Sequence, residues 1–246
     1  MEKTSAKSIL EFLTTENCRV ENQKPHSVNL TGRYSYQPQE LKEWDEFSIQ
    51  TMEEIYDGKL MEEARKKDCD DLFFPVLDPL DCTVNEETGT VNVLTKWTHT
   101  IVTRALRAVE KTLHPSIWVA KTGSINSIER NTTAKKKNKQ ASIPVTRLKP
   151  DAGAVAACKN SPPVERLPKE YKTASKWNSA QCIAQNLNEN GEWMQSAARN
   201  NYVMPIRQIY TYCITLGCRY GCIISTTEAF IFRIGPRTAE PGETGR

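Results

Sequence analysis

The stretch RLPKEYKT, residues 166 to 173, carries two opposite charges inside a segment whose pattern is typical of a strand. Side chains two residues apart in a strand point to the same face of the sheet. Glu170 and Lys172 therefore share one face, and Tyr171 points to the other. Taken alone, the pair is better explained by a solvent-facing strand edge that is protected by charge. At this composition about one Glu-x-Lys triplet is expected by chance, so the neighbouring sequence decides its meaning.

A second strand is predicted just before this one, and an acid stands at its head. The stretch RLKPDAGAVAA, residues 147 to 157, contains Pro150 and Asp151 and continues with small, apolar residues. Pairing of the two strands would bring Asp151 beside Glu170. Two carboxylates at one place repel each other unless a cation lies between them, and Mg²⁺ prefers such oxygen ligands. The sequence therefore predicts a metal site at which Lys172 orients or deprotonates a water molecule.

The residues around these two strands predict a mixed α/β fold with one central sheet. An apolar ladder with four-residue spacing predicts a helix that has Thr95 as its N-cap and ends before Pro115. Pro205 and Gly217 are typical of the first turn and of the end of a second helix. Further strands are predicted in SIWVAKTG (116–123), RYGCIIST (219–226) and EAFIFRIG (228–235). The order helix, three strands, helix, two strands indicates a mixed sheet flanked by helices.

The front of the chain is predicted to form a helical N-terminal extension over residues 1–90. Residues 39–67 follow a helical pattern that Pro38 introduces and that Gly58 interrupts. No residue of this part is assigned any chemistry. The sequence therefore predicts two units, the extension and a domain over residues 91–246.

Composition and charge narrow the class of protein. The 246 residues carry a net charge of +3, which does not by itself indicate a nucleic-acid-binding protein. No segment is as long as a membrane span, and the first apolar run is too short for a signal peptide. Cys213, Cys218 and Cys222 are interpreted as buried thiols, with a zinc site as the alternative. We expect an intracellular protein of the nucleus or cytoplasm.

Basic residues and histidines give no site of their own. The basic stretch NTTAKKKNKQ, residues 131–140, is either a solvated hairpin tip or a loop that contacts phosphates. The three histidines, His26, His99 and His114, belong to no motif. They are interpreted as structural or exposed residues.

Three short motifs follow one another along the chain: PD at 150–151, EYK at 170–172 and QIYTY at 208–212. This order resembles the PD-(D/E)XK nuclease superfamily, over about residues 95–235. One large branch of that superfamily also carries Gln-x-x-x-Tyr on a helix, and Gln208 and Tyr212 match this pattern on one helical face. The resemblance implies a restriction-endonuclease-like core. The prolines between the two strands depart from a regular hairpin and predict irregular pairing.

The resemblance also implies a metal centre and a reaction. Asp151 and Glu170 would bind Mg²⁺ or Mn²⁺ together with the carbonyl oxygen of Tyr171, and Lys172 would position the attacking water. The implied function is a metal-dependent nuclease that cleaves nucleic-acid phosphodiester bonds, with DNA favoured over RNA as the partner. Two alternatives remain open: an inactive nuclease-like module that binds nucleic acid or protein, and a helical interaction domain joined to an unrelated α/β unit.

Four further residues receive roles from the resemblance. Gln208 and Tyr212 would support the site or contact the nucleic-acid backbone, and a polar stripe on a buried helix is the alternative. Many members of the superfamily add an acid from the first helix. Glu110 matches best and Glu129 is a second choice, while a surface glutamate is the alternative for Glu110.

The segment RQIYTYCITLGCRYGCIISTTEAFIFRI, residues 207–234, also resembles part of large fungal proteins. Some of those proteins join this nuclease-like domain to a protein-kinase-like domain. The sequence contains neither a Gly-rich phosphate loop nor an HRD-type catalytic loop. By this resemblance the chain is the nuclease-like part of a longer protein, with a kinase-like domain following it.

Overall fold

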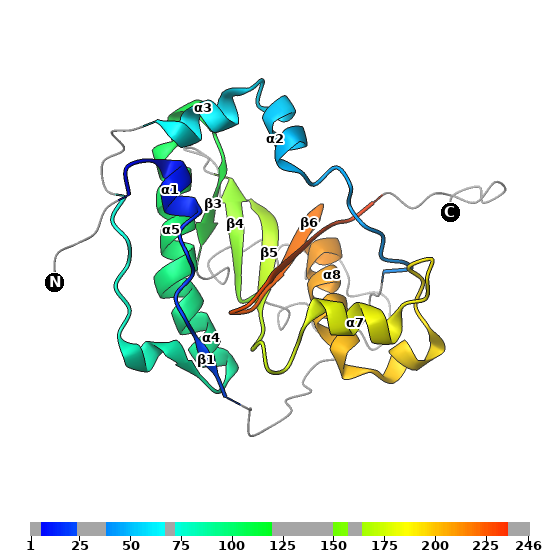
Figure 1. Cartoon of the computed structure of the whole chain (residues 1–246). Coiled ribbons are helices and arrows are strands. Elements are labelled where there is room, and N and C mark those ends of the chain that lie inside the picture. The colour runs from blue at the N-terminus through cyan, green and yellow to red at the C-terminus, as the bar shows by residue number, and fades with distance from the viewer. Residues whose placement is uncertain (1–5, 24–37, 67–71, 120–149, 157–163, 236–246) are drawn as a thin grey trace, which may run out of the picture.

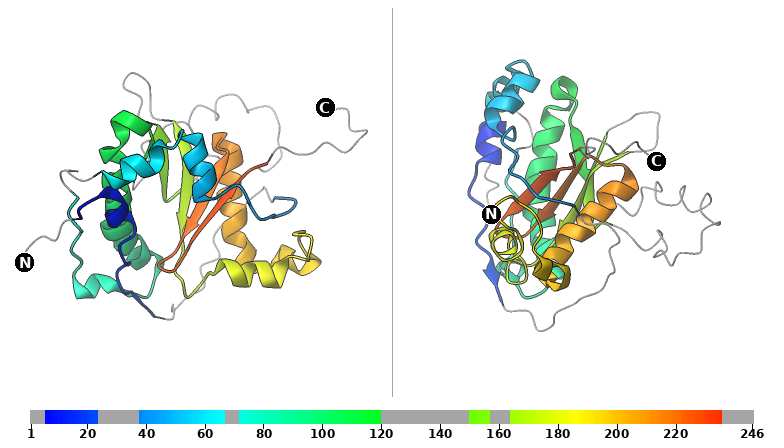
Figure 2. Two further views of the ribbon diagram at one scale, coloured as in Figure 1. Left: turned by 45° about the horizontal axis from the view of Figure 1, so that its top comes forward. Right: turned by 90° about the vertical axis from the view of Figure 1, so that its right-hand side faces the viewer.

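Helices cover both faces of a central sheet (Figure 1). The computed structural model describes residues 6–23, 38–66, 72–119, 150–156 and 164–235. Helices α4 (Glu87–Leu94) and α5 (Thr100–Ala108) lie on one face of the sheet, and helix α8 (Met204–Leu216) lies on the other (Figure 2). This arrangement is the mixed α/β architecture that the order of elements predicts.

The sheet has five strands in the order β3-β4-β5-β6-β7. Their bounds are β3 Ser116–Val119, β4 Ala152–Ala156, β5 Glu165–Tyr171, β6 Tyr220–Ile224 and β7 Ala229–Arg233. Strands β5 and β6 run parallel, and the other neighbouring strands run antiparallel. A register shift between Ala154 and Val155 makes the pairing of β4 with β5 irregular, as the prolines of this region predict.

The long helix on the first face begins earlier than the sequence pattern predicts. Helix α4 starts at Glu87, and Thr95 has helical dihedral angles, φ −69° and ψ −45°. A π-helical turn at Thr95–His99 then leads directly into α5. The β-branched threonines and valines of α4 have low helix propensity. The sequence pattern therefore does not predict a helix at these residues. Burial of Val93 and Leu94 against the rest of the chain stabilises the helix despite this propensity.

Helix α8 has the bounds that the sequence predicts. Pro205 lies in its first turn, and Gly217 follows its last residue in the left-handed conformation with φ 67°. Ile206 and Ile209 lie in a core cluster together with Trp177. The proline, the glycine and the apolar spacing act together here, so the sequence signal is unambiguous.

The crossover from β5 to β6 contains a helix that the sequence pattern does not indicate. Helix α7 (Ser179–Asn186) lies in a polar stretch, and the Asn178 side chain caps its N-terminus. Cys182 is its buried apolar contact with the core. Two 3-10 turns, Gln195–Arg199 and Asn201–Val203, lead from α7 into α8. The start of this helix is therefore set by its N-cap. Its sequence has little hydrophobic periodicity by which it could be predicted.

The front of the chain consists of short elements that pack against the rest. Their bounds are α1 Ile9–Leu13, β1 Glu21–Asn22, α2 Ile49–Ile55, α3 Lys59–Arg65, a 3-10 turn Pro79–Cys82 and β2 Thr83–Val84. Phe12 of α1 is fully buried in a cluster with Ile101 and Ala105 of α5. The predicted division after residue 90 lies within α4, and this cluster joins residues from both sides of it.

The helix predicted over residues 39–67 forms only in its second half. Residues 38–48 are not helical, and the Trp193 side chain donates to the carbonyl oxygen of Pro38 at 2.7 Å. The Leu41 N–H donates to the carbonyl of Gly191 at 2.8 Å, which holds the chain in an irregular path. Gly58, with φ 75°, separates α2 from α3 as predicted.

The described cysteines are free thiols. Cys213, Cys218 and Cys222 are buried, as the apolar sequence around them predicts. Burial raises the pKa of both Cys218 and Cys222 to about 12, so these thiols stay protonated at neutral pH. Among the described helices none is both long and apolar enough to cross a membrane.

Candidate metal centre

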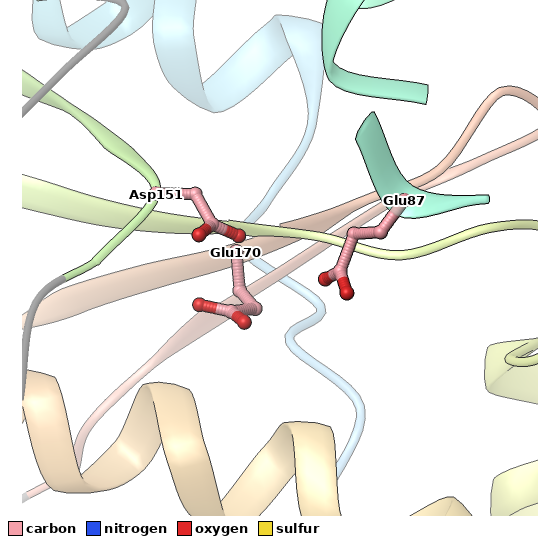
Figure 3. Close-up of side chains that lie close together, drawn as sticks. All are labelled: Glu87, Asp151 and Glu170. Atoms are coloured by element: carbon pink, nitrogen blue, oxygen red, sulfur yellow. The ribbon is translucent and has the colours of Figure 1, made fainter. Parts of the chain in front are cut away.

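Three carboxylates from three elements meet at one end of strands β4 and β5. One oxygen atom of each of Glu87, Asp151 and Glu170 lies within 4.8 Å of the other two (Figure 3). Glu87 is the first residue of α4, Asp151 directly precedes β4, and Glu170 lies in β5. Sets of carboxylate oxygens of this kind are the ligands that hard divalent cations prefer.

The pairing of β4 with β5 brings Asp151 beside Glu170. Ala152 pairs with Lys169 in the antiparallel ladder, so the preceding residue, Asp151, lies opposite Glu170. The backbone N–H of Tyr171 donates to Asp151 Oδ2 at 3.0 Å and fixes that carboxylate. The structure thus brings together the two acids of the strand motifs.

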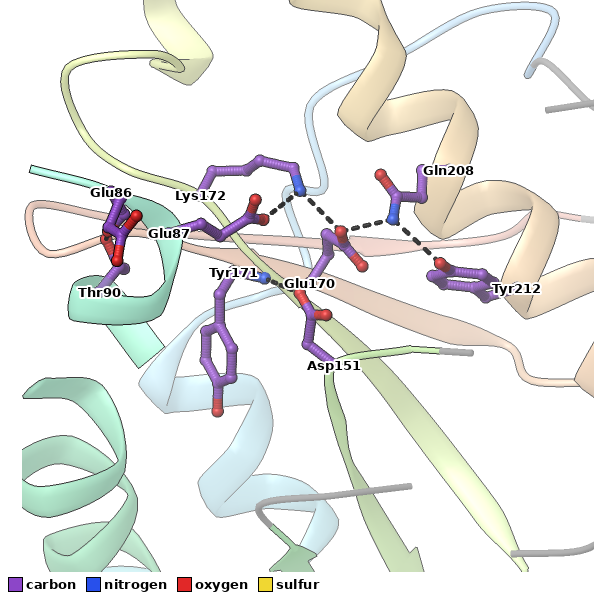
Figure 4. A network of polar contacts seen from close by, with 9 residues as sticks. All are labelled: Glu86, Glu87, Thr90, Asp151, Glu170, Tyr171, Lys172, Gln208 and Tyr212. Carbon is purple, nitrogen blue, oxygen red and sulfur yellow. Dashed lines mark hydrogen bonds and ion pairs between the residues drawn. The ribbon is translucent and has the colours of Figure 1, made fainter. Parts of the chain in front are cut away.

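Glu170 is the centre of a polar network (Figure 4). Its Oε1 accepts from Lys172 Nζ at 2.6 Å and from the side-chain amide of Gln208. The same amide donates to the Tyr212 hydroxyl at 2.9 Å. Glu170 is 2% exposed, and its Oε2 has no hydrogen-bond partner among the described residues. An unpaired, buried carboxylate oxygen is costly, and a bound cation would satisfy it.

The ammonium group of Lys172 bridges two of the acids. Besides Glu170 it contacts Glu87 Oε1 at 2.7 Å. Burial alone would lower the pKa of Lys172, but the carboxylates of Glu170 and Glu87 raise it above its usual range. Lys172 is therefore a cation in this arrangement. This charge fits the expected role in orienting a water molecule.

The two strand acids have raised affinities for protons. Burial raises the pKa of Glu170 to about 8, an effect that Lys172 opposes and that Asp151 and Glu87 increase. Burial of its carboxylate also raises the pKa of Asp151, although the N–H of Tyr171 opposes this shift. Glu170 therefore holds a proton more tightly than an exposed glutamate does. A divalent cation favours the ionised form, so its binding would release a proton here.

Glu110 does not join this centre. It is an exposed residue of helix α6 (Glu110–Leu113), and it belongs to none of the acidic clusters formed by the described residues. At about 1.5 Å per residue it lies roughly 35 Å from Glu87 along the row of helices from α4 to α6. The acid that this long helix contributes is therefore Glu87, at its opposite end, and the expectation for Glu110 gives way to the surface alternative.

The sequence pattern does not single out Glu87, because it predicts a helix that starts only at Thr95. Glu87 then falls in the N-terminal extension, to which the sequence assigns no chemistry. One signal was present: two acids, Glu86 and Glu87, stand directly before the run TGTVNVL, and acids are favoured in the first turn of a helix. The second choice for this acid, Glu129, and the basic stretch 131–140 lie outside the described residues.

Tyr171 presents its backbone, rather than its side chain, to the centre. The phenol ring is buried on the opposite face with Leu94 and Cys222, as the alternation of a strand predicts. In a strand the N–H and C=O of one residue point to the same neighbouring strand. Since the N–H donates to Asp151, the carbonyl of Tyr171 is directed to that side as well.

A second buried charge lies in β5, one residue before Glu170. Lys169 is fully buried, and its Nζ lies 3.6 Å from the centroid of the Trp118 ring without a hydrogen-bond acceptor among the described residues. Burial lowers the pKa of Lys169 to about 7, and burial raises the pKa of Glu165 to about 7. Burial and then the charge of Lys169 lower the pKa of His99. Lys169 points to the face of the sheet opposite to that of Glu170, because consecutive side chains of a strand alternate between faces.

A scan against models of protein families found no match to this chain, and neither did searches of curated proteins and of solved structures.

Proposed function

We propose that this chain is a metal-dependent nuclease of the PD-(D/E)XK type, which hydrolyses phosphodiester bonds of DNA in preference to RNA. The observation that carries the proposal is the convergence of Asp151 and Glu170 from paired strands, with Glu87 completing an acidic set and Lys172 in contact with it. The motif order and the sheet with helices on both faces are consistent with a restriction-endonuclease-like core.

The acids would hold Mg²⁺ or Mn²⁺. Glu87, Asp151 and Glu170 offer one oxygen each, and the carbonyl of Tyr171 is directed to the same side. When bound, such a cation provides hydroxide at neutral pH and stabilises the charge that develops on the phosphate. Lys172, as a cation next to the acids, would orient the water for attack.

Helix α8 would support the centre from the other side. Gln208 donates to Glu170 Oε1, and its second N–H is taken by the hydroxyl of Tyr212. These contacts restrict the rotation of the Glu170 carboxylate. Supporting partners of this kind orient metal ligands and are often needed for full affinity.

A cleavage assay tests the proposal. The full chain is incubated with labelled double-stranded DNA and, separately, with single-stranded RNA, in Mg²⁺ or Mn²⁺ and with an EDTA control. We expect cleavage of DNA that EDTA abolishes and that Asp151→Asn reduces by a factor of about 100 or more. Asp45→Asn, a change at an exposed acid outside the centre, should leave the rate unchanged.

One observation favours the alternative of an inactive binding module. The contact of Lys172 with both Glu87 and Glu170 already supplies a positive charge to the acids. A chain that binds labelled DNA by gel shift, yet cleaves neither DNA nor RNA in any divalent cation, would support that alternative and exclude the nuclease.

A further inference from the structure

The Lys172 ammonium occupies the side of the acidic set where Glu87 and Glu170 face each other. It lies 2.7 Å from Glu87 Oε1 and 2.6 Å from Glu170 Oε1. Those two acids belong to α4 and β5, so a single cationic side chain joins the helix to the sheet at the centre. Lys172 itself is the first residue after β5, and its side chain is 16% exposed.

A divalent cation bound to the three acids would lie close to this ammonium group. All three ligand oxygens fall within 4.8 Å of one another, so an ion that contacts them is also only a few ångströms from Lys172 Nζ. Two positive charges at such a distance repel strongly, the more so where water is partly excluded. We therefore expect one of the two contacts of Lys172 to open when the cation binds.

The exposures identify the contact that opens. The Glu170 side chain is 3% exposed, and Gln208 holds it through the same oxygen that Lys172 contacts. The Glu87 side chain is 45% exposed and has no other side-chain partner among the described residues. The contact between Lys172 and Glu87 is thus the less constrained one, and its opening frees a carboxylate for the cation.

We propose that Lys172 is the resident cation of this centre, which neutralises Glu87 and Glu170 until a divalent cation displaces it from Glu87. The proposal rests on the metal site of the proposed function and adds a competition within it. Lys172 then has two opposing effects: it weakens the binding of the divalent cation, and, once displaced, its charge is available to a water molecule or a phosphate oxygen.

Titration with Mn²⁺ alone, without nucleic acid, tests the competition. Isothermal titration calorimetry on the full chain compares wild type with Lys172→Met, and with Lys176→Met as the matched control in the turn that follows β5. We expect Lys172→Met to bind Mn²⁺ about fivefold or more tightly than wild type, since the competing charge is gone. Lys176→Met should match wild type.

Lys172→Arg provides a second test if Lys172→Met does not fold, as judged by circular dichroism. Because arginine keeps the charge, its affinity for Mn²⁺ should stay close to that of wild type or fall below it. Equal or weaker binding by a folded Lys172→Met protein, or clearly tighter binding by Lys172→Arg, overturns the proposal.

These outcomes separate the competition from the nuclease activity. If wild type never cleaves DNA but Lys172→Met binds Mn²⁺ more tightly, the competition holds and the nuclease function fails. If wild type cleaves DNA and Lys172→Met shows no gain in affinity for Mn²⁺, the nuclease function holds and the competition fails. If Mn²⁺ binds to none of the proteins, the metal centre and the competition are both wrong.

Discussion

Lys169 is a buried amine that lies on an indole ring and has no hydrogen-bond acceptor among the described residues. Below pH 7 it is charged in both the folded and the unfolded chain, and the folded chain bears the full cost of its burial. Between pH 7 and about 10.4 the unfolded chain binds more protons than the folded chain, so stability rises with pH in this window. The contribution of Lys169 to stability is therefore least favourable in acid.

Lys169→Met should consequently stabilise the protein, because methionine fills the space without a charge. We expect a gain of about 1 to 3 kcal/mol in the free energy of unfolding at pH 6, and a smaller gain at pH 9. Urea denaturation at the two pH values measures it, with Lys111→Met at an exposed position as the control. A gain that is as large at pH 9 as at pH 6 would contradict the argument.

In the proposed metal centre Gln208 would act through Glu170, to which it donates, and would not be a ligand itself. Gln208→Ala removes the donor that fixes Glu170 Oε1, and we expect it to weaken Mn²⁺ binding by a factor of about 10. Tyr212→Phe leaves that donor in place and should have a smaller effect. Calorimetric titration compares them with Gln181→Ala, the same change at an exposed position of α7. Equal affinities for Gln208→Ala and Gln181→Ala would remove the positioning role.

At the scale of elements, two left-handed glycines make different demands on the backbone. Gly217 ends α8 with φ 67°, and an added Cβ would meet no atom within 4 Å. Gly191 has φ 79°, and an added Cβ would lie 2.0 Å from the carbonyl oxygen of Leu41. At position 217 only the backbone conformation disfavours a residue with a side chain. At position 191 a side chain would also collide with the backbone of Leu41.

Alanine at these two positions should separate the two causes. We expect Gly217→Ala to lower the free energy of unfolding by about 1 kcal/mol, and Gly191→Ala to lower it by about 2 to 4 kcal/mol. Urea denaturation of both variants under one condition provides the comparison. Similar losses of unfolding free energy at the two positions would contradict the argument, because they would mean that the segment at Leu41 moves away from the added methyl group at little cost.

The sequence predicts an element well where several local signals agree. For α8, Pro205, the apolar spacing and Gly217 point to the same bounds, and the structure has them. The start of α4 was missed because its helix depends on burial of residues such as Val93, which no local pattern reveals. Glu87 was not predicted for the same reason. The other residues of the centre belong to short motifs that the sequence does show, and the structure brings them together: Asp151, Glu170, Lys172, Gln208 and Tyr212.

At the scale of the whole molecule, the N-terminal helix is part of the core rather than an attachment to it. Phe12→Ala, which leaves a cavity beside Ile101 and Ala105, should lower the free energy of unfolding by about 3 to 4 kcal/mol. Leu13→Ala is the matched control, because Leu13 is 46% exposed; its effect should stay below about 1 kcal/mol. Circular dichroism and tryptophan fluorescence should report one common transition. Two separate transitions would instead indicate that the front of the chain unfolds independently.

The parallel pairing of β5 with β6 also leads us to expect a particular order of events during folding. The chain must pass through α7 and α8 before Tyr220 can pair beside β5, and closing so long a connection is slow compared with forming the β6–β7 hairpin. The contact between Glu170 and Gln208 depends on this closure. We therefore expect the hairpin to form early and the acidic set to gain its support from α8 among the last steps. By the proposed function, a nascent chain would then bind divalent cations more weakly than the complete sheet does.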